Sequence, residues 1–195
     1  MILALAVVVG LALSWLRHRS RAGRQIAAIQ LRWAWLALLA ALLQIPLLRA
    51  PFVPTQQVAI QQLLFLLSHL LLLVFVWQNR RLLAIQILGV GVICNLLVIL
   101  LNGGFMPITP ETLVRINPGT VQEQWTTGYH YARSKDVILH RDDVRLWALS
   151  DMLVLPPPFP WPTAFSLGDL LIALGIVVLL QGPVRSREAS EGVAA

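Results

Sequence analysis

The sequence predicts an all-α, polytopic membrane protein with five transmembrane helices and one long extracytoplasmic loop between the fourth and the fifth. Hydrophobic residues make up 57% of the 195 residues and charged residues only 12%, whereas soluble domains carry about 25% charged residues. Five apolar runs of near-spanning length follow one another along the chain. Arginines stand mostly at the ends of these runs, which is typical of membrane topology signals.

The first part of the chain, residues 1–101, is expected to hold four of the helices. We expect them at about 1–16, 26–48, 58–77 and 82–101. No positive charge precedes the first run and several arginines follow it, so we interpret it as a retained helix rather than a cleaved secretory signal. Prolines mark a short turn at 50–57, and Gln-Asn-Arg-Arg at 78–81 predicts a tight turn.

Residues 102–164 are expected to form a folded loop with short helices of its own. Asn102-Gly103-Gly104 predicts a helix stop, because glycine accepts the left-handed closing turn. Thr109-Pro110 and Asn117-Pro118 each predict an N-cap followed by proline at the first helical position. A third short helix is expected at 141–149, and the proline-rich segment 156–162 is expected to be extended.

The fifth helix is expected at 165–181, and a polar tail follows at 182–195. The positive-inside rule places the N-terminus outside and the C-terminus in the cytoplasm. The predicted inner segments hold Arg17, Arg19, Arg21, Arg24, Arg80, Arg81, Arg185 and Arg187, whereas the short outer turn holds only Arg49. Membrane lipids are therefore the expected partners. The net charge of +6 does not indicate nucleic acid, since the arginines flank apolar runs.

His69 is the ionisable residue nearest the middle of a predicted span. A lone imidazole there can bind a cofactor such as a haem or relay protons. Its expected depth matches Gly89 and Gly91 on the next helix, so a histidine hydrogen-bonded between closely packed helices is the favoured interpretation. The cofactor is left open. Asn95, Gln44 and Gln86 are expected to be interhelical hydrogen-bonding residues.

Ser166 and Asp169 open the last helix and have the spacing of a capping box. We favour this cap over a proton or cation site at Asp169. His130, His140, Asp142 and Asp143 match no zinc or calcium spacing. Catalytic motifs are not recognised, so enzymatic activity is uncertain and the sequence argues more against it than for it.

Three blocks in the second half of the chain carry a family resemblance. They are Asn-Gly-Gly-Phe-Met-Pro at 102–107, Arg-Leu-Trp-Ala-Leu-Ser-Asp at 145–151, and Phe-Ser-Leu-Gly-Asp at 165–169. Together they resemble the bacterial membrane proteins grouped as domain of unknown function 5317. Where members often have Leu-Gly-Asp, this chain has Leu149-Ser150-Asp151. The resemblance implies a several-helix bacterial inner-membrane protein and supplies no activity.

The resemblance also indicates which residues to examine. The family-motif and loop-docking positions are Asn102, Gly103, Gly104, Met106, Pro107, Arg145, Leu146, Asp151, Ser166, Gly168 and Asp169. We expect the outer corner of the molecule to bring Asn102, Met106, Asp151 and Asp169 together.

Three functional hypotheses follow from the sequence. The leading one is a non-catalytic membrane protein whose outer loop serves assembly, as an accessory subunit among other subunits of a larger membrane complex. The second is a small-molecule or lipid transporter with Asn95, His69 and Gln44 along its path. The third is an outer-face enzyme that uses Asp151 and Asp169 as a carboxylate pair.

Overall fold

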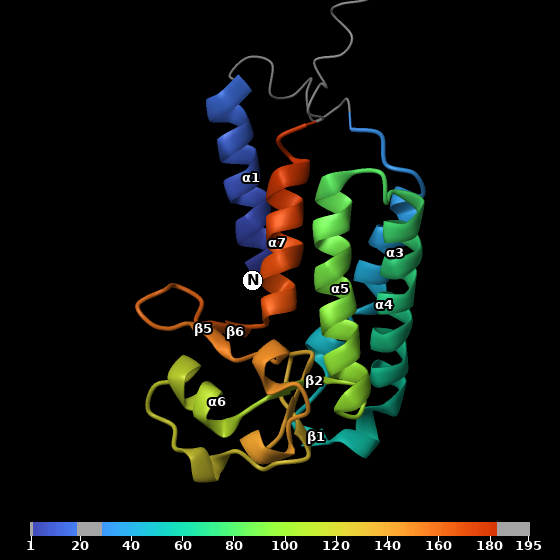
Figure 1. The fold of residues 1–195 in the computed structure, drawn as a ribbon. Coiled ribbons are helices and arrows are strands. Elements are labelled where there is room, and N and C mark those ends of the chain that lie inside the picture. The colour runs from blue at the N-terminus through green and yellow to red at the C-terminus, as the bar shows by residue number, and fades with distance from the viewer. Residues whose placement is uncertain (1, 19–28, 183–195) are drawn as a thin grey trace, which may run out of the picture.

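A bundle of five apolar helices carries all remaining structured segments at one of its ends (Figure 1). The computed structural model describes residues 2–18 and 29–182. The helices are α1 (Ile2–His18), α3 (Ala34–Leu43), α4 (Ala59–Gln78), α5 (Leu83–Leu101) and α7 (Leu167–Leu179). Helix α7 packs against α1 and α5, and α4 packs against α5 and α3. The helices therefore follow one another in the order α1, α7, α5, α4, α3.

Two segments are long and apolar enough to cross a membrane by length and composition, namely Thr55–Gln78 and Leu83–Leu101. Helices α1, α3 and α7 belong to shorter apolar segments. The structure therefore supports a mostly helical protein with two candidate membrane-spanning helices, and the sequence prediction of five is not supported at this length.

Helix α3 shows why the predicted spans are too long. A helix was expected over 26–48, but Trp33 directly before α3 has a left-handed backbone with φ of 55°. At the other end Pro46 has no N–H to continue the hydrogen-bond ladder, and the chain passes through turns into a 3₁₀ turn at Leu47–Arg49. Residues 26–28, like Arg19, Arg21, Arg24, Arg185, Arg187 and nearly all of the tail, lie outside the described residues.

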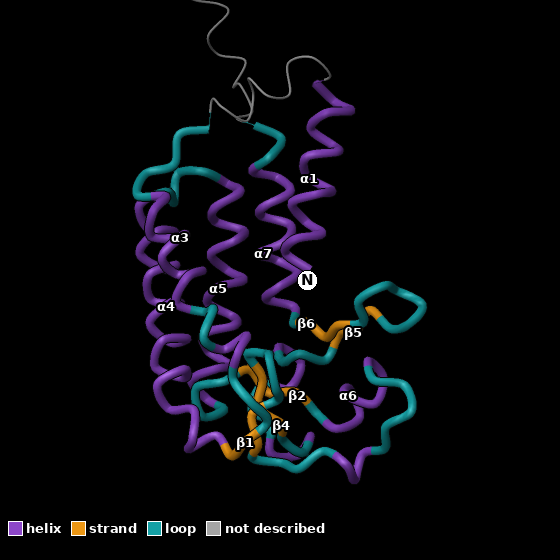
Figure 2. Tube along the Cα trace, turned by 180° about the vertical axis from the view of Figure 1, so that it is seen from behind, coloured by secondary structure: helices purple, strands orange, loops and turns teal. Residues whose placement is uncertain are grey.

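The end of the bundle carries a region that we call the sheet module, defined as residues 102–166 together with Val53–Pro54. Its four-stranded sheet has the order β1 (Val53–Pro54), β3 (Tyr129–His130), β4 (Asp136–Ile138), β2 (Met106–Ile108). Strands β2 and β4 are parallel, and the other pairs are antiparallel. Strands β5 (Leu153–Leu155) and β6 (Thr163–Phe165) form a separate antiparallel hairpin. Figure 2 shows all strands gathered at this end.

These strands make the all-α prediction wrong. Each has only two or three residues, which is too short for the alternation that marks a strand in a sequence. Strand β1 comes from the segment expected to be a simple outer turn. The segment 156–162, expected to be extended, instead turns back between β5 and β6, where the Phe159 N–H donates to the Pro156 carbonyl at 3.1 Å.

Of the short helices predicted in the module, one is present and the others are not. Helix α6 (Pro110–Ile116) begins as predicted, with the Thr109 hydroxyl accepting from the Thr112 N–H. Asn117 was expected to start a helix, but it ends α6, and its side-chain amide donates to the Leu113 carbonyl. The helix expected at 141–149 is replaced by two 3₁₀ turns, Arg141–Asp143 and Trp147–Leu149, with Leu146 between them at φ of 56°.

An apolar core joins the sheet module to the bundle. Phe65 of α4 and Ile99 of α5 pack in one cluster with Phe105, Met106 and Val137 of the module, and all five side chains are buried. Complete burial of such a side chain contributes about 1.5–3 kcal/mol. The module is therefore anchored by hydrophobic packing as well as by the polar contacts described below.

Candidate functional site

Lys135 stands directly before strand β4 and reaches two carboxylates from distant parts of the chain. Its Nζ lies 2.7 Å from Asp169 Oδ2 at the start of α7 and 3.3 Å from Asp151 Oδ2 before β5. We call Lys135, Asp136, Asp151, Asp169, Asn95 and Ser166 the Lys135 cluster. The cluster connects the sheet module to helices α5 and α7.

Helix α7 presents Asp169 to this cluster through its own cap. The Ser166 Oγ accepts from the Asp169 N–H at 2.9 Å, and both halves of the predicted capping box are present, which confirms that prediction. Asn95 of α5 donates to Asp169 Oδ1 at 2.7 Å and accepts from Ser166 Oγ at 2.8 Å. The expectation that Asn95 bonds between helices is therefore confirmed.

Helices α5 and α7 pack closely enough for these hydrogen bonds to form. A Cβ at Gly168 would overlap the Asn95 amide oxygen and would lie 2.8 Å from the Gly91 carbonyl oxygen. Farther from the sheet module, a Cβ at Gly175 would lie 2.8 Å from the Ala84 carbonyl oxygen. Small residues let the two backbones pack at this separation, and Gly168 thereby leaves room for the Asn95 side chain.

Asp151 is 1% exposed and is held in place by its backbone. Its N–H donates to the Pro107 carbonyl at 3.2 Å. Ser150, which stands where family members often have glycine, has φ of −75° and an extended backbone that any residue adopts. The Ser150 hydroxyl also donates to the Trp147 carbonyl at 2.7 Å, so this corner does not require glycine.

Three carboxylates surround the single ammonium group of Lys135. Burial by itself would lower the pKa of Lys135, but the carboxylates of Asp151, Asp169 and Asp136 outweigh it and raise the pKa above the usual 10.5. Burial raises the pKa of Asp151 well above its usual value, and Lys135 offsets this only in part. Burial likewise raises the pKa of Asp136. The cluster therefore favours a protonated lysine and resists full ionisation of its carboxyl groups.

A second junction lies at the end of α5. The Asn102 side chain accepts from the Arg145 N–H at 2.9 Å and donates to the Arg145 carbonyl at 2.9 Å. Gly103 and Gly104 have φ of 82° and 88°, which confirms the predicted glycine stop. Leu146, the neighbour of Arg145, takes the left-handed conformation that redirects the chain toward Asp151.

His69 lies elsewhere, inside the bundle. Its Nδ1 is 3.0 Å from the Phe65 carbonyl oxygen of its own helix, so the expected hydrogen bond between helices is wrong. Gly89 faces Val76 of α4, whereas Gly91 faces α7, so the two glycines do not form one notch against His69.

The remaining polar residues of the helices have separate partners. Gln44 donates to the Ser68 hydroxyl at 3.0 Å and bonds between segments as expected. Gln86 donates to the Arg80 carbonyl in the α4–α5 turn, which corrects its expected interhelical bond. Both ring nitrogens of His130 lie near carbonyl oxygens, of Pro51 and Ser134. Within the described residues no group of three or more His, Cys, Asp or Glu side chains is arranged to hold a metal ion.

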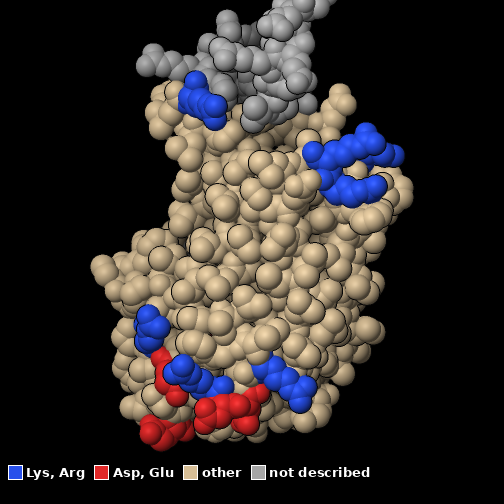
Figure 3. All heavy atoms as spheres, in the orientation of Figure 1, with Lys and Arg blue, Asp and Glu red and all other residues tan. Residues whose placement is uncertain are grey.

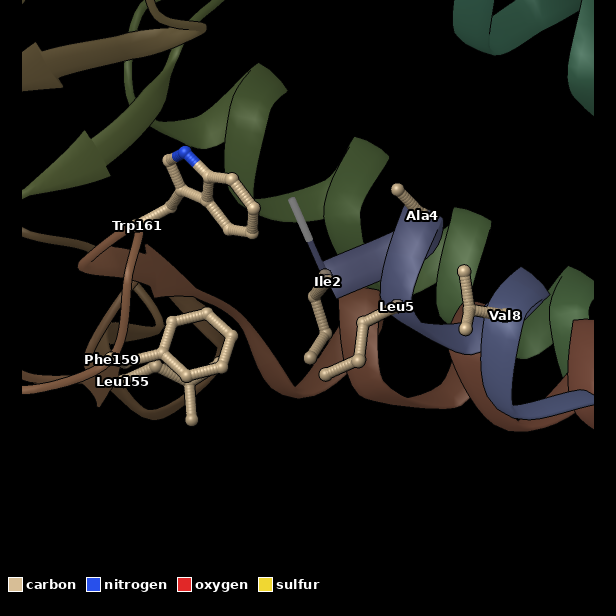
Figure 4. Close-up of a pocket in the computed structure, with 7 residues that line it drawn as sticks. All are labelled: Ile2, Ala4, Leu5, Val8, Leu155, Phe159 and Trp161. Atoms are coloured by element: carbon tan, nitrogen blue, oxygen red, sulfur yellow. The ribbon is translucent and has the colours of Figure 1, made fainter. Parts of the chain in front are cut away.

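An apolar pocket of about 280 Å³ lies between the start of α1 and the β5–β6 hairpin. Figure 4 shows Ile2, Leu5 and Val8 facing Leu155, Phe159 and Trp161 across it. Its lining offers no acid, base or nucleophile for catalysis.

Sequence reasoning identified Asp151 and Asp169 but missed Lys135 and Asp136. Lys135 is the single lysine of the sequence, beside 14 arginines among the 15 basic residues. The presence of one lysine among arginines could have indicated this site, because a lysine ammonium is a compact charge that is suited to contact several carboxylates at once.

Comparison with known proteins identifies the family to which this chain belongs. A family model described as "Family of unknown function (DUF5317)" matches residues 28–181, well over half of the chain. Among curated proteins and solved structures, none matches significantly. The matched range includes the three sequence blocks and every residue of the Lys135 cluster. The chain therefore belongs to the DUF5317 family.

Proposed function

We propose that this protein is a multi-pass integral membrane protein without catalytic activity, whose sheet module serves assembly with other subunits of a membrane complex. One observation carries the non-catalytic role. Lys135 binds both Asp151 and Asp169, so the carboxylates best placed for acid–base chemistry are instead occupied in holding the module on the bundle.

The direction of the helices supports membrane crossing by all five. Helices α1, α4 and α7 begin at the module end, whereas α3 and α5 end there (Figure 1). Large apolar side chains are exposed on the bundle, among them Leu38, Ile60, Leu63 and Leu83. Extended apolar surface of this kind marks contact with a membrane or with protein. The shorter helices would cross where the bilayer thins or where flanking side chains reach the headgroups.

The distribution of charge supports an outward-facing module. On the face shown in Figure 3, the described residues place basic side chains without acidic ones at the end opposite the module, and both signs together at the module end. Arg17 lies in the last turn of α1, and Arg80 and Arg81 lie in the α4–α5 turn. The positive-inside rule then places that end in the cytoplasm of a bacterial cell.

Cysteine labelling tests this topology. Cys94 is the only cysteine, so Cys94→Ala gives a cysteine-free background for one substitution at a time. Glu123→Cys in the module should react with a membrane-impermeant thiol reagent in intact spheroplasts. Arg81→Cys should react only after permeabilisation. Equal labelling of the two in intact spheroplasts would contradict the proposed arrangement.

Native-state mass measurement tests the assembly role. The protein is purified from its native host in mild detergent, and we expect a mass above that of one chain together with co-purifying membrane subunits. Lys135→Met, which weakens the attachment of the module, should lose these subunits while remaining in the membrane fraction. Arg115→Met on the exposed side of α6 should keep them. A monomer that purifies without partner subunits would contradict the assembly role.

A transporter remains the alternative function, supported by the polar pair Gln44 and Ser68 between α3 and α4 and by the buried His69. Once a transport phenotype is known, His69→Leu decides between the two. Unchanged transport in that variant removes this alternative. An outer-face enzyme is tested by the double variant Asp151→Asn, Asp169→Asn, since a folded variant with full activity excludes it.

A further inference from the structure

Two buried carboxyl oxygens of the Lys135 cluster accept no hydrogen bond from the described nitrogen and hydroxyl groups. They are Asp136 Oδ1 and Asp151 Oδ2, which accept no hydrogen bond from a nitrogen or hydroxyl group in the part of the chain that the structure describes. Lys135 donates its hydrogen bond to Asp151 Oδ1 and contacts Oδ2, at 3.3 Å, as an ion pair only. Asp136 is 6% exposed and Asp151 is 1% exposed, so bulk solvent does not reach these oxygens. An unpaired acceptor at such depth costs about 1–3 kcal/mol.

The two carboxyl groups face each other. Asp136 and Asp151 approach each other closely enough for a side-chain hydrogen bond between them to lower the pKa of Asp136. Ionised carboxylates only accept hydrogen bonds, so such a bond requires a proton on one of them. A single shared proton supplies a donor where the two buried oxygens otherwise have none.

The neighbouring positive charge does not compensate the carboxylates of both Asp136 and Asp151. Lys135 Nζ lies closer to Asp169, at 2.7 Å, than to Asp151, at 3.3 Å. With every group ionised the cluster would carry one positive and three negative charges. His69 on α4 also lies within electrostatic reach of Lys135 and Asp169. Lys135 lies closest to Asp169, and its single positive charge offsets only in part the effect of burial on Asp151 and Asp136.

We propose that Asp136 and Asp151 bind one proton between them, and that this proton fastens the sheet module to the helical bundle. Loss of the proton to solvent leaves two anions side by side in a buried site, where their repulsion is weakly screened. Asp136 lies on β4 and pairs with Met106 of β2, and the Asp151 N–H bonds to Pro107. Deprotonation therefore loosens the corner where β2, β4 and Asp151 meet.

The sign of the pH dependence follows from the raised pKa of both carboxyl groups. A group whose pKa is higher in the folded protein contributes stability below its unfolded value and loses it as the pH rises through the folded value. The ordinary carboxyl value is 3.8. The contribution of this proton to the attachment is thus largest under acidic conditions and decreases as the pH rises, by at most about tenfold per pH unit. The ion pair with Lys135 favours the ionised form of Asp169, which contributes in the opposite sense and only at lower pH.

Infrared spectroscopy of the full chain in lipid nanodiscs tests the proton directly. At neutral pH the wild type should show the carbonyl stretch of a buried protonated carboxyl group. Both Asp136→Asn and Asp151→Asn should lose that band, since an amide supplies the donor and the remaining carboxyl ionises. Asp142→Asn, a matched change of an exposed carboxylate, should keep it. A missing band in the wild type, or a band that survives both substitutions, overturns the proposal.

Protease cleavage of the module gives a second readout. Over a series from about pH 5 to pH 9 the wild type should become more cleavable as the pH rises, until the pair has lost its proton, after correction with an unfolded reference peptide, because one proton is lost on opening. Asp136→Asn should show little pH dependence, and Asp142→Asn should behave as the wild type does. A wild type with flat cleavage across this range contradicts the proposal. Neither readout involves partner subunits, so its failure leaves the assembly role standing.

Discussion

Lys135 and Asp169 are separated by 34 positions in the chain, yet the lysine Nζ lies 2.7 Å from Oδ2 of the aspartate. Lys135 belongs to the sheet module and Asp169 to the first turn of α7. Asn95 of α5 holds the other oxygen of the same carboxylate. The contact fixes the module against two helices at once, so its removal has consequences beyond one ion pair.

Replacement of Lys135 with methionine should weaken the attachment of the module. The change keeps much of the side-chain volume but leaves the carboxylates of Asp151 and Asp169 without their cation. Removal of one partner from a buried ion pair costs about 3–5 kcal/mol, and because the Lys135 side chain is 29% exposed we expect the lower end of that range. Chemical unfolding in detergent followed by tryptophan fluorescence measures it. Arg115→Met should change the free energy of unfolding by less than about 0.5 kcal/mol.

Substitution of Asn102 by aspartate should remove half of its contact with Arg145. A carboxylate still accepts from the Arg145 N–H but has no N–H to donate to the Arg145 carbonyl. We expect a loss of about 1 kcal/mol for Asn102→Asp and about 2 kcal/mol for Asn102→Ala, from net hydrogen-bond values. Hydrogen exchange of the amides from 141 to 151 measures the loss. Equal protection in the alanine variant and the wild type would contradict the assigned role of Asn102.

Gly168→Ala should separate α5 from α7. The added methyl group would overlap the Asn95 amide and approach the Gly91 carbonyl, and overpacking of this kind costs about 1–3 kcal/mol. Thermal unfolding of the purified protein reports the change. Leu174→Ala, on the exposed side of the same helix, is the control and should cost less. If the two variants unfold at the same temperature, contact at Gly168 is not tight.

Lys135 should resist amine-reactive reagents. Its pKa is raised above 10.5 by the surrounding carboxylates, so its contribution to stability is fully present below 10.5 and is lost only as the pH rises through the higher folded value. Reagents of this class attack the neutral amine, which is scarce here. Mass spectrometry of the variant Arg115→Lys compares Lys135 with a surface lysine in one molecule. Equal labelling rates would show that Lys135 is not held in its ion pairs.

Local sequence signals predicted much of the helical framework. The capping box at Ser166 and Asp169, the Thr109 cap and the Asn102-Gly103-Gly104 stop all act within three or four residues, so the residues that form each contact are visible together in the sequence. Apolar runs likewise marked where each helix of the bundle lies. Their lengths were less accurate, because the left-handed backbone at Trp33 and the missing N–H of Pro46 shorten α3.

The sequence by itself therefore determined a helical chain of this family, the existence of its apolar helices and the caps that begin and end several elements. Tertiary structure decided the rest. The strands are too short to carry a pattern, and the turn 53–54 becomes β1 only because β3 lies beside it. Lys135 meets Asp151 and Asp169 only after folding, since charge pairing across distant segments has no fixed spacing in sequence. Local geometry is encoded locally, whereas an ion cluster depends on where the packed backbone brings its members together.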